Sequence, residues 1–127
     1  MTWQYIAGFF DGEGCITYTS EDRLQLSVSQ KRPKVIYRIQ EFLALNGIES
    51  VIYIQKSSQH VLRIKQGKRK ENAIKFLNLI FPFLVCKRTV VQDFLRFMKI
   101  FPGMNKQVKG ISKRLIARDL ITCYNYE

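Results

Sequence analysis

A short glycine-rich segment near the N-terminus constrains this chain more than any other part of it. Residues 5–14 read Y-I-A-G-F-F-D-G-E-G, an apolar helical run that ends in two acids, Asp11 and Glu13, set among glycines. Gly8 and Gly12 are four residues apart, so they share one face of a helix. A helix face without side chains lets another backbone approach closely. The segment predicts a close helix pair that brings carboxylates to one point, although a plain helix with a glycine-rich stop would read similarly.

Length and composition narrow the class of protein. The 127 residues are 46% hydrophobic, which suits one globular domain with a real core. The single histidine and the absence of a CxxC pair argue against zinc, so any metal is expected to have oxygen ligands. Cys15, Cys86 and Cys123 are expected to be reduced thiols. No secretory signal or spanning apolar run is visible, which favours an intracellular protein, in the cytoplasm of a prokaryote or in an organelle, without a membrane partner.

The positive charge is concentrated in the second half of the chain. The net charge is +11, yet residues 1–62 hold six basic and six acidic side chains, whereas residues 63–127 hold fifteen and four. Basic chains of this size commonly bind nucleic acid. A solubilising surface, or adaptation to a ribosome or membrane surface, is the plainer alternative.

Hydrophobic periodicity predicts a helix followed by a hairpin in the first third of the chain. The helix is expected to run from residue 2 or 3 to Gly12. Alternation over residues 15–19 and 23–29 then predicts two strands joined by a turn at residues 20–22. Leu24, Leu26 and Val28 point to one side of the second strand, and hydrogen-bonding side chains point to the other. By itself, that polar side could equally be an ordinary solvent-facing surface.

The same pattern repeats in the middle of the chain. Pro33 suits the first turn of a helix that ends near Asn46, and a second hairpin follows. Ile52 and Ile54 are expected to face inward with Leu62 and Ile64, whereas the outward set is Val51, Tyr53, Gln55, Val61, Arg63 and Lys65. Further helices are predicted over residues 70–81, 85–100 and 113–124. The fold class is therefore predicted to be α+β, in the order α-ββ-α-ββ-α-α with an extra helix at the end.

Residues 6–14 resemble the signature of the LAGLIDADG homing endonucleases position by position. Phe9 and Phe10 are bulky apolar replacements, Gly12 stands for alanine, and Glu13 stands for the second aspartate. The predicted element order is also that of one LAGLIDADG domain, and the resemblance covers about residues 3–100. It implies a curved four-stranded antiparallel sheet with helices on its convex face and DNA on its concave face. Residues 1–127 are expected to form this single domain, with residues 101–127 as a C-terminal helical extension.

Three further positions match the single-motif branch of this family. Gln30, in V-S-Q-K, takes the place of a polar residue that holds an active-site water, and Lys34 that of a basic residue near the scissile phosphate. Lys87, in P-F-L-V-C-K, matches the active-site lysine. Each lysine alone would be read as a solvated surface residue, and Lys31 or Arg32 could stand in for Lys34.

The resemblance also implies a Mg²⁺ site at the end of the first helix. Glu13 would supply a carboxylate and Gly12 a backbone carbonyl, because Mg²⁺ takes oxygen ligands and keeps several waters. Mn²⁺ is expected to substitute, and Ca²⁺ to bind without supporting cleavage. Lys87 would offset the charge that develops during phosphodiester hydrolysis. Asp11 is expected to serve mainly in helix packing.

The motif occurs once, so one chain supplies half an active site and a C₂ homodimer is predicted. Its interface is expected to comprise Ile6, Ala7, Gly8, Phe9, Asp11 and Gly12. DNA contacts are expected from Thr17, Thr19, Arg23, Gln25, Ser27, Ser29, Lys31, Arg32, Tyr53, Gln55, Arg63 and Lys65. A strand of about seven residues reaches ~24 Å, or about seven base pairs, so the dimer would read a palindromic or near-palindromic site of roughly twenty base pairs.

The function implied by this resemblance is site-specific cleavage of double-stranded DNA. The enzyme would hydrolyse one phosphodiester per strand across the minor groove and leave short 3′ overhangs. Two alternatives stay open: an intron maturase of the same fold that binds its own intron RNA, and a DNA-binding regulator without catalysis. The presence of Glu13 and Lys87 favours the nuclease.

Overall fold

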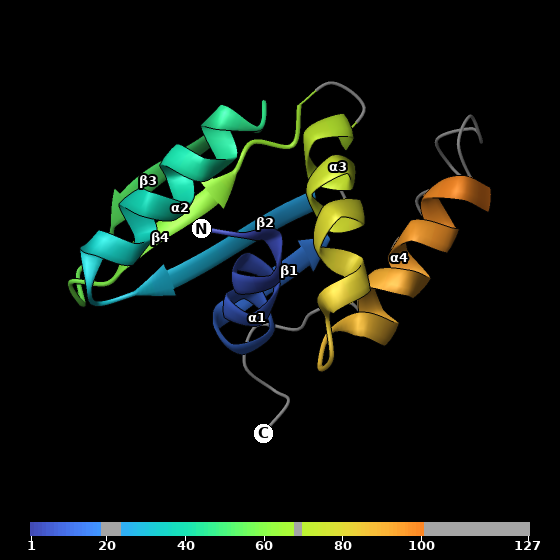
Figure 1. The fold of residues 1–127 in the computed structure, drawn as a ribbon, viewed down its shortest axis with the longest axis horizontal. Helices are drawn as coiled ribbons and strands as arrows, with labels where there is room; N and C mark the ends of the chain where they lie inside the picture. The colour runs from blue at the N-terminus through green and yellow to red at the C-terminus, as the bar shows by residue number, and fades with distance from the viewer. Residues whose placement is uncertain (19–23, 68–69, 101–127) are drawn as a thin grey trace.

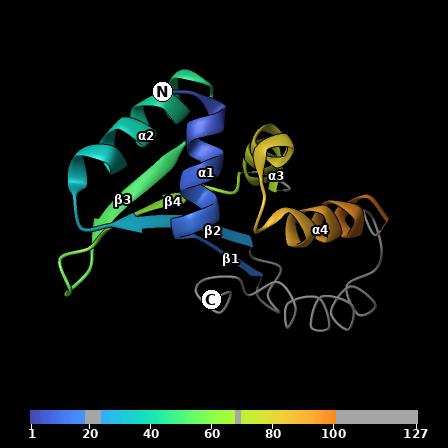
Figure 2. The same cartoon turned by 60° about the horizontal axis from the view of Figure 1, so that its bottom comes forward.

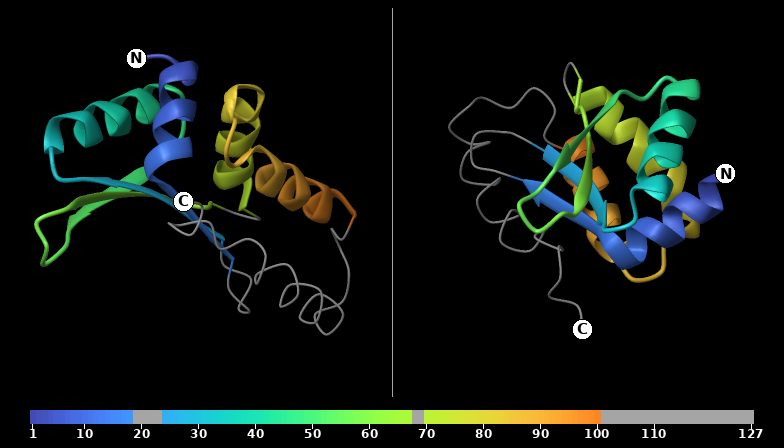
Figure 3. Two further views of the ribbon diagram at one scale, coloured as in Figure 1. Left: turned by 90° about the horizontal axis from the view of Figure 1, so that it is seen from below. Right: turned by 90° about the vertical axis from the view of Figure 1, so that its left-hand side faces the viewer.

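The computed structural model describes residues 1–18, 24–67 and 70–100 and has the predicted α+β order (Figure 1). Its elements are α1 (Trp3–Glu13), β1 (Gly14–Tyr18), β2 (Leu24–Gln30), α2 (Pro33–Leu45), β3 (Ser50–Ile54), β4 (His60–Ile64), α3 (Glu71–Ile80), the 3₁₀ helix η2 (Phe81–Phe83) and α4 (Arg88–Ile100). The strands form one antiparallel sheet in the order β1-β2-β4-β3. The helices lie on one side of the bent sheet, as Figure 3 shows. The turn predicted at residues 20–22 and the helix predicted at residues 113–124 lie outside the described residues.

Helix α1 has well-defined signals at both ends. The Thr2 hydroxyl accepts a hydrogen bond from the Tyr5 backbone N–H at 3.1 Å, which caps the first turn. Ile6, Ala7 and Phe10 make the buried face of the helix. Gly14 closes the last turn, since its N–H donates to the carbonyl of Phe10, and the chain then enters β1 directly.

Aromatic contacts hold α1 between its two neighbouring helices, and Figure 2 shows α2 on one side of it and α3 on the other. The Trp3 ring meets Phe42 of α2 edge-on, with centroids 5.0 Å apart. The Phe10 ring meets Phe76 of α3 in the same manner at 5.6 Å. Edge-to-face pairs of this kind are worth about 0.5–1.5 kcal/mol beyond their buried area. The position of α1 is therefore fixed within the chain itself.

Both hairpins have the predicted facing, but the exposure of two residues in the second differs from what that facing suggests. Leu24, Leu26 and Val28 are buried as predicted. Ile54 was expected inside but is 62% exposed, because it is the last residue of β3, which lies at the sheet edge. Val61 lies on the outward face as predicted, but it is only 4% exposed, because β4 is a central strand and Ser29 and Tyr53 flank Val61 on either side.

The last described helix begins later than predicted. Residues 81–83 form η2, and α4 starts at Arg88 instead of residue 85. Pro82 has no backbone N–H to continue α3, so the chain tightens into a 3₁₀ turn and then extends before it re-enters helix. No helix within the described residues is long and apolar enough to span a membrane.

The cysteines only partly meet the expectation. Cys86 is an exposed free thiol, as predicted. Cys15 is part of a disulfide, so the prediction of a reduced thiol is wrong for that residue. Cys123 lies outside the described residues.

Replacing Gly14 by alanine is expected to lower the free energy of unfolding by about 1–3 kcal/mol. A Cβ there would overlap the carbonyl oxygen of Phe10 and stand 2.6 Å from its ring atom Cδ1. Gly8→Ala is the matched control, because a Cβ at Gly8 meets nothing within 4 Å among the residues that the structure describes. That control should gain up to about 1 kcal/mol from helix propensity. Urea denaturation at a concentration where the chain is monomeric measures the free energy of unfolding of both variants. Equal changes in the two variants would contradict the packing at Gly14.

Candidate functional site

The C-terminal end of α1 presents the predicted metal ligands. Gly12 and Glu13 are exposed there. The carboxylate of Glu13 makes no hydrogen bond or ion pair with any residue in the described part of the chain. A helix C-terminus is its negative end, so an unpaired carboxylate in the last turn favours a nearby cation. The Gly12 carbonyl is one of the helix's last carbonyls, which lack partners within the helix.

Asp11 links this end of α1 to the segment before α4. Its carboxylate accepts a hydrogen bond from the Val85 backbone N–H at 2.6 Å and another from the Lys87 backbone N–H at 3.0 Å. Asp11 therefore has a structural role within the chain, which is to link α1 to residues 85–87; its predicted role in helix packing stays a prediction. Its two partners could not be predicted from the sequence, because they lie 74 and 76 residues further along the chain.

The side chain of Lys87 also bonds to the end of α1. Its Nζ donates to the backbone carbonyl of Asp11 at 2.7 Å and lies 5.9 Å from the centre of the Phe10 ring. The residue is only 4% exposed. A cation at the C-terminus of a helix is stabilised by the helix dipole. Lys87 is thus brought next to the last turn of α1, where it contacts Asp11, two residues before Glu13 in the chain, and it is not an ordinary solvated lysine.

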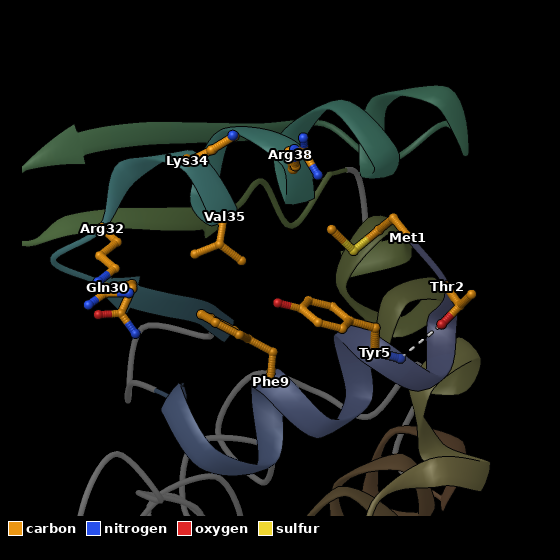
Figure 4. Close-up of a pocket in the computed structure, with 9 residues that line it drawn as sticks. All are labelled: Met1, Thr2, Tyr5, Phe9, Gln30, Arg32, Lys34, Val35 and Arg38. Atoms are coloured by element: carbon orange, nitrogen blue, oxygen red, sulfur yellow. Dashed lines mark hydrogen bonds between the residues drawn. The ribbon is translucent and has the colours of Figure 1, made fainter.

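Gln30 and Lys34 lie on the other side of α1. Gly14 pairs with Val28 in the sheet, so the end of β2 lies beside the end of α1. The Gln30 side chain accepts a hydrogen bond from its neighbour, the Lys31 backbone N–H, at 2.9 Å. Gln30 and the exposed Lys34 line one groove between α1 and α2 (Figure 4). The exposed Lys31 and Arg32 lie in the connection between β2 and α2, so both alternatives to Lys34 are close by.

The face of the sheet opposite the helices carries the predicted DNA-reading residues that the structure describes. The register places Thr17 opposite Gln25, Ser27 opposite Arg63 and Ser29 opposite Val61. None of the four strands contains an acidic residue. Gln55 is exposed in the turn after β3. Thr19 and Arg23 lie outside the described residues.

Two basic residues of this set have partners within the chain. Nη2 of Arg63 donates to the Tyr53 hydroxyl at 3.3 Å, and its guanidinium carbon lies 5.1 Å from the centre of the Tyr53 ring. Arg63 is therefore held in place by a neighbouring strand. Lys65 forms an ion pair with Glu49 at 3.6 Å between two exposed side chains, which offsets part of its charge.

The predicted dimer face of α1 is smaller than the sequence suggested. Ile6 and Ala7 are buried in the core of the chain itself, so their side chains do not contribute to the exposed face of α1. The carboxylate of Asp11 is likewise engaged within the chain. Gly8 and Gly12 are exposed, and a Cβ on either would meet no atom of the described residues within 4 Å. The half-buried Phe9 lies beside them in the groove toward α2.

The end of α1 fits a divalent cation only in part. Glu13 and the helix-end carbonyls supply oxygen ligands of the type that Mg²⁺ prefers. Across the described residues, however, no three side chains of His, Cys, Asp or Glu converge to hold a metal. One chain thus offers one carboxylate at this point.

Comparison with known families identifies the domain. A family model described as LAGLIDADG-like domain matches residues 3–80, which is more than half of the chain. The chain belongs to this family. The LAGLIDADG resemblance predicted from residues 6–14 is therefore confirmed. No match was found among curated protein sequences.

Solved homing endonucleases share the fold of this LAGLIDADG domain. I-TnaI aligns over 96% of this chain and 89% of its own with a TM-score of 0.71 and 20% identity. The archaeal intron-encoded I-Vdi141I, complexed with DNA, aligns over 93% of this chain and 80% of its own with a TM-score of 0.69 and 22% identity. The LAGLIDADG meganuclease I-AabMI, bound to uncleaved DNA, aligns over 89% of this chain but 42% of its own, with a TM-score of 0.62 and 22% identity.

Asp11→Ala is expected to lower the free energy of unfolding by about 1.5–3 kcal/mol, since it removes charge-assisted hydrogen bonds to two backbone amides. Asp93→Ala, at an exposed position of α4, is the control and should change stability by less than about 0.5 kcal/mol. Urea denaturation of both variants at one protein concentration provides the comparison. Similar small effects would mean that the link between α1 and residues 85–87 adds no stability.

Proposed function

We propose that this protein is a site-specific DNA endonuclease that works as a homodimer with divalent metal bound at the ends of its two α1 helices. The observation that carries the proposal is the position of Glu13. Its carboxylate is exposed and unpaired in the described part of the chain, at the end of a helix whose outer face is open at Gly8 and Gly12. Two such helices side by side would bring two carboxylates to one point.

The glycines of α1 support the homodimer. A glycine within a helix costs about 1 kcal/mol relative to alanine. Because a Cβ at Gly8 or Gly12 would meet no described residue within 4 Å, packing within the described part of the chain gives no reason for either glycine. The close approach of a second backbone would explain why glycine is used at both positions. The alignment with I-AabMI, which uses less than half of that chain, is consistent with a unit that must be doubled.

The polar residues around Glu13 have distinct roles in this proposal. Glu13 and the Gly12 carbonyl would hold Mg²⁺, which when bound activates water and neutralises phosphate. Lys87, fixed against the end of α1 by its bond to the Asp11 carbonyl, would stabilise negative charge on the phosphate. Gln30 would hold a water by hydrogen bonding, and Lys34 would contact the DNA backbone. The related I-CvuI was crystallised on DNA with 2 mM Mg in one case and with 2 mM Ca in another.

The outer face of the sheet suits base recognition. An antiparallel ribbon fits the major groove, where hydrogen-bonding side chains meet the base edges. Gln25, Ser27 and Arg63 lie on that face without an acidic neighbour in any strand. Lys31 and Arg32, directly after β2, would contact phosphates, which position the protein without reading sequence. A long site read by two symmetric halves follows from this arrangement.

Glu13→Gln should abolish cleavage and leave DNA binding in place, because it removes a metal ligand and keeps the size of the side chain. A randomised palindromic DNA library first selects the cleaved site, and gel assays with Mg²⁺ or EDTA then compare the variants. Glu41→Gln, exposed on α2, is the control and should cleave normally. A Glu13→Gln protein that cleaves at near wild-type rate would refute the metal site. A wild type that binds DNA or RNA and never cleaves would favour the regulator or the maturase.

Arg63→Ala should cost about 1–3 kcal/mol of binding at one guanine position per half-site and relax the choice of base there. Tyr53→Phe keeps the ring under the guanidinium but removes the hydroxyl, so its effect should be smaller and at the same position. Lys56→Ala, in the exposed turn after β3, should at most weaken all sites evenly. The affinity of each variant for a set of single-base variants of the site measures these effects. If Arg63→Ala weakens binding equally at every site, the outer face of β4 does not lie in the groove.

A further inference from the structure

We propose that His60 is a positioning residue for Gln30: the side-chain N–H of Gln30 donates a hydrogen bond to the Nδ1 atom of His60. His60 is the only histidine of the chain. The inference rests on the proposed function and deepens it, because Gln30 is the residue that would hold a water at the active site. His60 would touch neither the DNA nor the metal, and it would act only through Gln30.

The register of the sheet sets the two side chains next to each other. His60 is the first residue of β4 and Gln30 is the last residue of β2, and the two are directly opposite in the antiparallel pairing. Opposite residues project from the same face of a sheet, with their Cβ atoms about 4.5–5.5 Å apart. A glutamine side chain is long and flexible enough for its amide to span that separation.

Both side chains lie on the helix-covered face of the sheet. Val28, two residues before Gln30, and Leu62, two residues after His60, are buried on that face. The His60 ring meets the Tyr37 ring of α2 edge-on, with the ring centroids 6.1 Å apart. Gln30 lines the groove between α1 and α2 on the same face (Figure 4). The amide and the imidazole therefore share one side of the sheet.

The Nδ1 atom of His60 is buried and has no hydrogen-bond partner in the described part of the chain. A buried polar atom without a partner is costly, so a nearby group is expected to satisfy it. Three of the cross-strand neighbours on the same face are apolar: Ile52 and Ile54 of β3 and Val28 of β2. The fourth is Gln30, whose side chain can donate the missing hydrogen bond.

The amide of Gln30 already has one end fixed. Its Oε1 accepts a hydrogen bond from the Lys31 backbone N–H at 2.9 Å. The Nε2 end carries two N–H donors. With one of them donated to His60, the plane of the amide would be set at both ends, and the second N–H would be left to hold the water. Such positioning matters because a displacement of about 1 Å at a reacting group can slow a reaction about 100-fold.

The single histidine allows a test that does not depend on activity. In full-length protein with isotope-labelled histidine, nuclear magnetic resonance observes one imidazole, and couplings to the ring protons distinguish Nδ1 from Nε2. Gln30→Met keeps the length of the side chain and removes the amide, so the Nδ1 resonance of His60 should move. Gln25→Met is the matched control: Gln25 lies on the opposite face of β2, and its replacement should leave the resonance at the wild-type position. An unchanged resonance in Gln30→Met would overturn the hydrogen bond.

Two replacements of His60 test the consequence for cleavage. His60→Asn puts an amide oxygen near the place of Nδ1 and so keeps an acceptor for Gln30, whereas His60→Phe keeps a ring against Tyr37 and removes the acceptor. On the selected DNA site, His60→Phe should lower kcat about tenfold and leave the dissociation constant for DNA within about twofold of wild type. His60→Asn should stay within about twofold of wild type in both quantities. Equal losses of kcat in the two variants would overturn the positioning role.

Together, the resonance and the cleavage rates separate a failure of this inference from a failure of the proposed function. A wild type that cleaves no DNA, while Gln30→Met moves the His60 resonance, overturns the nuclease and leaves the hydrogen bond standing. A wild type that cleaves, while the resonance is unchanged or His60→Phe cleaves at the wild-type rate, overturns the role of His60 alone. Circular dichroism and urea denaturation check the folding of each variant. If His60→Phe does not fold, the resonance in Gln30→Met decides the question.

Discussion

The candidate site depends on the hydrogen bonds between Asp11 and residues 85–87. The Asp11 carboxylate fixes two amides of the segment before α4, and Lys87 returns a hydrogen bond to the end of α1. The helix end that carries Glu13 and the loop that carries Lys87 therefore cannot move independently. Two residues that would act on one phosphate are kept in register by a third that need not touch it.

The two faces of helix α1 have different structural roles. Ile6, Ala7 and Phe10 anchor it in the core between α2 and α3, so its direction is set before any partner arrives. Gly8 and Gly12 leave the other face open. A helix fixed in this way can present its last turn to a second copy without reorganising, which lowers the entropic cost of assembly. In the proposed dimer, association and the formation of the metal site are the same process.

The charge of the protein is separated from its candidate reading surface. The excess of basic residues arises after residue 62, whereas the four strands contain no acid and a single arginine. A face of serine, threonine and glutamine can discriminate bases by hydrogen bonds, while lysine and arginine elsewhere supply attraction to phosphate that is independent of sequence. Affinity and specificity can then vary separately in this protein.

The sequence by itself determined the family, the order of elements and the inward face of the first hairpin, because the 3.6- and 2-residue periodicities and the glycine signature are local properties. It also predicted Glu13, Gln30, Lys34 and Lys87 as site residues, a set that stays a prediction. Tertiary structure decided the rest. Val61 is buried because its strand is central, and Ile54 is exposed because its strand is an edge. The partners of Asp11 and the groove between α1 and α2 join residues far apart in the chain, and no local pattern encodes such contacts.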